Sequence, residues 1–200
     1  MIQLLLPNAD ESQLGRHYAF TLIGFTFVFI FALMYFESEP NIGEHCLLNS
    51  TLRARLWVLI HLILSYGLLI IGVSLKAIAY YDDLSEIKKE DKMLLSIGAA
   101  VASTSLSTIR LLHKGVIGIS ERRFGTYTAR FAIGFLHGFV GMMSSEVFLV
   151  LCLHLALALC TLAIDIASRM KRSAREREQR DDKESELGKK GSDDTATEFI

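Results

Sequence analysis

The sequence has few of the residues that define several classes of protein. Its three cysteines are widely separated, so they build neither a disulfide framework nor a zinc knuckle. Two prolines and 14 glycines among 200 residues exclude collagen-like and proline-rich chains. Basic and acidic residues nearly cancel, 21 against 22, and lack the clustering of a nucleic-acid-binding surface. We therefore expect no nucleic-acid partner.

The motifs of common enzyme classes are also missing. The chain contains no glycine-rich phosphate loop, no nucleophile elbow, no His-Glu-x-x-His and no Cys-x-x-Cys. The sequence therefore predicts no catalytic residue and no cofactor, and we expect a protein that is not an enzyme.

Long uncharged runs are what the sequence does have. A helix that crosses a membrane needs about 20 mostly apolar residues. Four runs come close to this length, and a fifth becomes 17 residues long if it starts at Tyr127 and Arg130 extends to the lipid headgroups. The five predicted spans are residues 18–36, 56–75, 93–109, 127–143 and 147–164.

These runs predict an all-α, multi-pass transmembrane helix bundle of five spans, with four spans as the alternative. The transmembrane domain is expected over residues 18–167, after an extramembrane segment over residues 1–17. Residues 168–200 are charged and hold few apolar side chains, so we expect a disordered tail there. The lipid bilayer is the expected partner, although the sequence does not indicate which membrane.

The loop charges predict an orientation. Five spans leave five basic residues on the side of the N-terminus and fourteen on the other side, whereas four spans give twelve against seven. The positive-inside rule favours five spans, and it places the C-terminus in the cytoplasm under either count. The glycosylation sequon at Asn49 would then face the cytoplasm, where it is inert, so we do not expect glycosylation.

Two histidines in the last two spans form the first candidate site. His137 lies seven residues before Ser144, and His154 lies eight residues after Glu146. A helical hairpin would therefore bring both imidazoles to a similar depth, with Glu146 above them. The three side chains could bind a metal ion or relay protons. The alternative is two neutral histidines that hydrogen-bond to neighbouring helices.

A second candidate lies at the opposite end of the first two spans. Glu37 ends the first span, and His61 lies one and a half turns inside the second. A contact between them would orient the imidazole and increase its basicity. The pair could act as a proton-titrating gate, or as a clamp between the two spans.

Small and hydroxyl-bearing residues mark the surfaces where helices should pack closely. The third span carries Ser103 and Ser107 in a row of small residues that recurs every four positions, and a polar permeation path along it is the alternative. Gly134 and Gly138 form a Gly-x-x-x-Gly row in the fourth span. That row predicts a close-packing face, either within the chain or against a second copy or a larger membrane partner.

Several short motifs together suggest a family. Residues 34–37 read Met-Tyr-Phe-Glu, residues 55–62 read Arg-Leu-Trp-Val-Leu-Ile-His-Leu, and residues 68–73 read Leu-Leu-Ile-Ile-Gly-Val. A span of small residues that ends in Arg110 follows. Over residues 18–165 the chain resembles the C-terminal half of the low temperature requirement A family of membrane proteins. The family's N-terminal motif, a histidine and a Glu-Arg pair before a Gly-Glu-containing span, has no counterpart here.

The resemblance implies a multi-pass integral membrane protein with a transport-related or stress-related role. Because family members are longer, the chain is expected to be either a fragment or a shortened descendant. The alternatives are a helper or scaffold subunit without catalytic activity, and an intramembrane protein that handles metal ions or protons through His137 and His154.

Overall fold

The computed structural model describes residues 11–38, 50–79, 81, 87–114, 121–143 and 146–196. These residues form helices and short connections, with no strand among them, which confirms the predicted all-α fold. The helices are α1 (Glu11–Ser38), α3 (Thr51–Ala79), α4 (Lys89–Lys114), α5 (Glu121–Met143) and α6 (Val147–Ala196). Each predicted span lies inside one of them.

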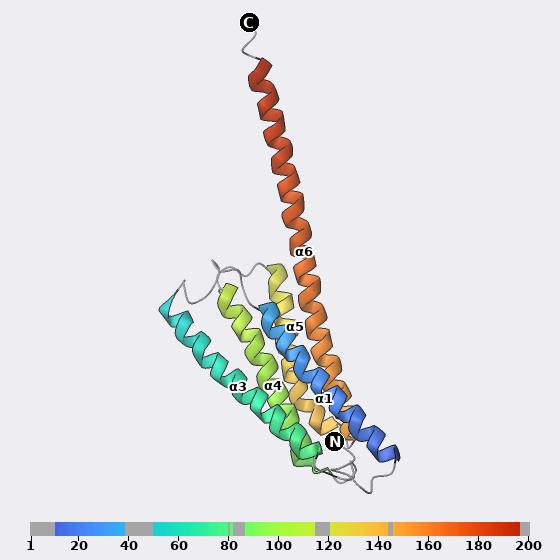
Figure 1. The fold of residues 1–200 in the computed structure, drawn as a ribbon. Helices are drawn as coiled ribbons and strands as arrows, with labels where there is room; N and C mark the ends of the chain where they lie inside the picture. Colours follow the sequence, from blue (N-terminus) through green and yellow to red (C-terminus); the bar gives the residue numbers. More distant parts are fainter. Residues whose placement is uncertain are drawn as a thin grey trace. The chain divides into compact units, whose positions relative to one another are not determined.

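The chain divides into two compact units, Met1–Leu162 and Ala163–Ile200. The first unit holds α1, α3, α4, α5 and the beginning of α6, and its successive helices run in opposite directions (Figure 1). Its core combines bulky apolar side chains from α1 with small and branched ones from α4, among them Phe27, Phe31, Ala99 and Leu106.

Four of the helices contain segments that are long and apolar enough to cross a membrane. These segments are His17–Ser38, Thr51–Ala79, Lys89–His113 and Val147–Lys171. Their outer surfaces carry large exposed apolar side chains, such as Phe25 at 72% and Leu69 at 61% exposure, which a lipid environment would cover. These features indicate an integral membrane protein.

Helix α5 is not among these four, because the side it buries is polar. Arg130 and His137 are both fully buried, and both lower the mean hydropathy of the helix. The expectation that Arg130 extends to the headgroups is wrong. Its Nε donates a hydrogen bond to the Ser107 hydroxyl of α4, 3.4 Å away, so the side chain satisfies polar groups inside the protein.

Helices α3 and α4 pack at very short range because each carries a glycine at their contact. A Cβ added at Gly67 of α3 would stand 2.9 Å from the backbone nitrogen of Ala102. One added at Gly98 of α4 would stand 3.0 Å from the backbone nitrogen of Ile71. The backbones of α3 and α4 can approach this closely only without side chains at both positions.

The structure describes a helix over most of the segment, residues 168–200, for which the sequence predicts a disordered tail. Helix α6 continues without a break to Ala196. This stretch contains no proline and is rich in arginine, lysine and glutamate, which favour helix formation even where no apolar face stabilises a fold.

A hydrogen bond joins Tyr81, two residues after the end of α3, to the first turn of α4. The Tyr81 hydroxyl donates to the Asp91 carboxylate at 2.9 Å. This hydrogen bond raises the pKa of Tyr81, because the carboxylate accepts from the protonated phenol and repels the phenolate.

The contact between α3 and α4 yields a matched test. We expect Gly67→Ala to lower the stability of the protein by about 1–3 kcal/mol, because the new methyl group meets α4 backbone that cannot move aside. Gly72→Ala is the control, since a Cβ at this exposed glycine of α3 meets nothing within 4 Å. The readout is the thermal denaturation midpoint in detergent micelles, and equal midpoints for the two variants would contradict the packing described.

Candidate functional site

Two fully buried histidines meet where α5 turns back into α6. The Nδ1 atoms of His137 and His154 lie 2.8 Å apart, and the two rings are nearly parallel at a centroid separation of 5.1 Å. The hairpin brings the two side chains together, because His137 lies about two turns before the end of α5 and His154 about two turns after the start of α6. We call these two residues the histidine pair.

The hydroxyl of Ser96 on α4 extends the histidine pair. Its Oγ lies 3.0 Å from Nε2 of His154, so both ring nitrogens of His154 have a partner. Nε2 of His137 has no hydrogen-bond partner among the described residues. The result is an ordered series of polar groups from three helices, which runs from Ser96 through His154 to His137.

The position of Ser96 depends on a glycine of α5. A Cβ added at Gly141 would stand 2.6 Å from Ser96 Oγ and 2.7 Å from the carbonyl oxygen of Lys92. Any larger residue would therefore displace the first turns of α4. Glycine at this position lets α4 bring its hydroxyl within hydrogen-bonding distance of His154.

Aromatic side chains of α1 cover the pair. The Phe27 ring centroid lies 5.8 Å from that of His154 and 6.2 Å from that of His137. Phe31 lies one turn further along α1, at 6.3 Å from His137. Both phenylalanines are buried, so the pair is enclosed by apolar rings on this side.

Glu146 does not join the pair. Its residue is exposed at the start of α6, whereas both histidines are fully buried. A carboxylate is favourable there, because it can stay hydrated beside the positive end of the helix dipole. The predicted three-residue site is therefore reduced to two, and the described part of the chain holds no group of three His, Cys, Asp or Glu residues suited to a metal ion.

A second cluster, which we call the Trp57 cluster, ties α1, α3 and α4 together at the other end of the unit. The rings of Trp57 and His61 are tilted by 43° with centroids 3.8 Å apart, and His61 Nδ1 lies 2.8 Å from the carbonyl oxygen of Trp57. The carbonyl only accepts, so Nδ1 carries the proton and Nε2 accepts from the Tyr35 hydroxyl at 3.3 Å. The Trp57 indole N–H donates to His113 Nε2, also at 3.3 Å.

The structure gives His61 a partner on α1, and the predicted contact with Glu37 stays a prediction. Its contact on α1 is Tyr35, two residues before Glu37, while Glu37 itself is half-buried near the end of the same helix. The sequence spacing places His61 at the depth of the end of α1. It does not give the direction of the side chains, which decides the partner.

The predicted packing residues lie at the contact between α4 and α5. Gly134 faces Thr104 and Ser103, and Gly138 faces Ala100. The Gly-x-x-x-Gly row therefore packs within the chain, and its use by a second protein stays a prediction. Ser107 is fully buried between Arg130, which donates to its hydroxyl, and the carbonyl oxygen of Ser103, to which it donates.

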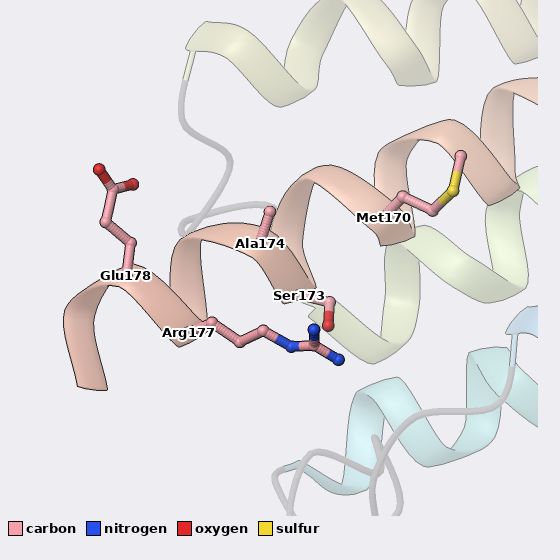
Figure 2. A pocket seen from close by; sticks show the side chains of 5 residues that line it. All are labelled: Met170, Ser173, Ala174, Arg177 and Glu178. Carbon is pink, nitrogen blue, oxygen red and sulfur yellow. The ribbon is translucent and has the colours of Figure 1, made fainter. Parts of the chain in front are cut away.

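Other features add no site. Asn49 lies outside the described residues. A shallow pocket on α6 is lined by side chains of that helix alone (Figure 2). One helix face cannot enclose a ligand, so this hollow lacks the convergent polar groups of a binding site. Its lining residues are Met170, Ser173, Ala174, Arg177 and Glu178.

Comparisons with family models, with curated proteins and with solved structures find no match to this chain. Its resemblance to the low temperature requirement A family stays a prediction from short motifs.

Sequence reasoning missed Ser96 and His113 of these clusters, and also the buried position of Arg130. Ser96 was visible only as one hydroxyl of many in the third span, His113 lies beyond the predicted end of that span, and Arg130 was assigned to the headgroups. The position of Arg130 directly before the uncharged run of residues 131–143 was the one signal that could have indicated a buried polar face on α5.

The Trp57 cluster predicts an energetic coupling between α3 and α4. Trp57→Phe keeps the ring but removes the N–H that donates to His113. In a double-mutant cycle with His113→Phe, we expect a coupling of about 1 kcal/mol, the usual value of one hydrogen bond. Stability is measured by thermal denaturation in detergent. Additive effects of the two substitutions would mean that this hydrogen bond does not stabilise the protein.

Proposed function

We propose that the protein handles protons inside the membrane, by passing them along the series Ser96, His154 and His137. The observation that carries this proposal is the 2.8 Å contact between the two buried Nδ1 atoms. A neutral imidazole has one N–H and one lone pair, so a contact this short requires a single proton between the rings.

The series has two neutral arrangements. In the first, His137 Nδ1 donates to His154 Nδ1, and His154 Nε2 donates to the Ser96 hydroxyl. In the second, Ser96 donates to His154 Nε2, His154 Nδ1 donates to His137 Nδ1, and the proton of His137 lies on Nε2. Each ring holds one proton in both arrangements.

A switch between these arrangements moves one proton through the pair. His137 Nε2 takes a proton that originates from hydronium, the Nδ1 proton of His137 moves to His154, and the Nε2 proton of His154 leaves through the Ser96 hydroxyl to water. One proton enters and one leaves, so no charge stays behind. As in any hydrogen-bonded chain, the groups must reorient before a second proton follows.

Histidine suits this role better than other residues that could hold two helices together. A clamp between α5 and α6 needs only one donor and one acceptor. Serine or asparagine supplies these with a smaller desolvation free energy than histidine. Imidazole adds a second nitrogen, so one ring can accept a proton at one nitrogen while it releases a proton from the other. Two adjacent imidazoles therefore offer a route that a simple clamp lacks.

The geometry favours protons over a metal ion. Two imidazole nitrogens on one tetrahedral zinc ion lie about 3.3 Å apart, because each Zn–N bond is about 2.0–2.1 Å long. The Nδ1 atoms are 2.8 Å apart, which is a hydrogen-bond distance. The exposed Glu146 offers no third ligand to the buried pair.

The proposal is tested by proton flux in liposomes that contain the purified full chain and a pH-sensitive dye inside. His154→Gln keeps a side chain that can hydrogen-bond to His137 and Ser96, but an amide does not exchange protons. We expect the flux driven by a potassium diffusion potential to fall by at least about tenfold, in line with the loss of a proton-transfer group.

The control is His17→Gln, which changes a histidine at the start of α1 outside the pair. It should leave the flux unchanged. If wild type and His154→Gln give the same flux while both remain folded, the pair is a structural clamp and the proposed function is wrong.

A further inference from the structure

Helix α3 carries a line of exposed side chains on its outer side, which we call the α3 stripe. Its members follow one another at alternating steps of three and four residues, the spacing at which two helices pack along a shallow left-handed crossing. Of the four apolar spans, that of α3 buries the smallest share of its residues, 22%. The members of the stripe are each 51–66% exposed, and they are Leu59, Leu62, Tyr66, Leu69 and Val73.

Two cations mark the depth of the stripe in the membrane. Arg55 and Lys76 continue its spacing, one step before its first member and one step after its last. Both are exposed, so their charged groups can reach the lipid headgroups. The distance between them along the helix is about 31 Å, which matches the hydrocarbon thickness of about 30 Å. The stripe therefore crosses the hydrocarbon layer, and Tyr66 lies near its middle.

Tyr66 is unfavourable on a surface that only lipid covers. Tyrosine is usually found at the membrane interface, where its hydroxyl meets water. The hydroxyl of Tyr66 makes no hydrogen bond to the described residues, although the side chain is the most exposed of the stripe. Hydrocarbon offers no hydrogen-bond partner, so a hydroxyl at this depth loses the free energy of its hydration without replacement. A second protein helix on this side would supply the missing partner.

The partner that this hydroxyl matches best is its own copy. A phenol has one proton to donate and lone pairs that accept, so two tyrosines can satisfy one another. All copies of a membrane protein insert in the same orientation, so a two-fold axis along the membrane normal makes two α3 helices parallel. Each member of the stripe then meets its counterpart at the same depth. A single polar residue in an apolar seam also fixes the register of the two helices.

We propose that the α3 stripe is the contact between two copies of this chain, with the two Tyr66 hydroxyls hydrogen-bonded to each other at its centre. The exposed halves of the ten side chains amount to on the order of 1,000 Å², the area that a specific interface requires. Arg55 and Lys76 meet their counterparts only at the headgroups, where water and ions screen the repulsion. Gly134 and Gly138 of α5 already face α4, so that row is occupied within the chain.

Single-molecule photobleaching of the fluorescently labelled full chain measures the pairing while the protein is diluted in phosphatidylcholine liposomes. We expect pairs that dissociate on dilution. Tyr66→Phe keeps the ring and removes the hydroxyl, so it should weaken the pair about threefold, the usual effect of one hydrogen bond between membrane helices. Tyr18→Phe is the matched control, because Tyr18 is an exposed tyrosine at the beginning of the α1 span. It should leave the affinity unchanged.

Cysteine cross-linking in the same liposomes locates the contact. Leu69→Cys changes a member of the stripe, where the two helices come close enough for a disulfide. Leu68→Cys is the control, since Leu68 is also exposed at nearly the same depth but lies about 100° around the helix. After mild oxidation, mass spectrometry should find the peptide of the first variant joined to its own copy, and that of the second variant unjoined.

Monomers at every dilution would mean that lipid alone covers the stripe, and would overturn the proposal. Equal cross-linking of the two cysteine variants would place the contact elsewhere, and an affinity unchanged in Tyr66→Phe would remove the hydroxyl from it. Cross-linking of the Leu69→Cys variant in native membranes provides the last check. A disulfide to a different protein there, without the self-joined peptide, would assign the stripe to another partner and overturn the second copy.

Discussion

A single proton shared by two imidazoles is the interaction on which the arrangement of α4, α5 and α6 depends. Nitrogen atoms 2.8 Å apart repel one another unless a hydrogen lies between them, so His137 and His154 must hold complementary tautomers. The Ser96 hydroxyl can serve either tautomer of His154, since it both donates and accepts. Enclosure by Phe27 and Phe31 strengthens these hydrogen bonds, because water does not compete on that side.

The close approach of the helices makes this contact possible. Gly67 and Gly98 let α3 and α4 touch through their backbones, and Gly141 lets α5 pass directly over Ser96. In a membrane, packing of this kind replaces the hydrophobic driving force that water supplies to soluble proteins. The hydroxyls of α4 therefore have two uses, since they fill little space at the contacts and they supply hydrogen bonds to the polar residues of α5 and α6.

The sequence predicted the helices well, because each long uncharged run has one physical explanation. It also predicted that His137 and His154 reach similar depth, because a hairpin fixes the register on both sides of its turn. It could not predict Ser96 as the third member, since that depends on which face of α4 meets α6. The partner of His61 and the burial of Arg130 were missed for the same reason, because side-chain direction depends on packing between helices.

The central claim is the shared proton, and a nitrogen–nitrogen scalar coupling tests it most directly. In a solid-state NMR experiment on the ¹⁵N-histidine-labelled protein in bilayers, an N–H···N hydrogen bond transmits a coupling between its two nitrogens. We predict a cross-peak between the Nδ1 atoms of His137 and His154, one with the shift of a protonated nitrogen and one with that of an acceptor. Two protonated Nδ1 atoms, or resolved signals without any coupling, would contradict the account.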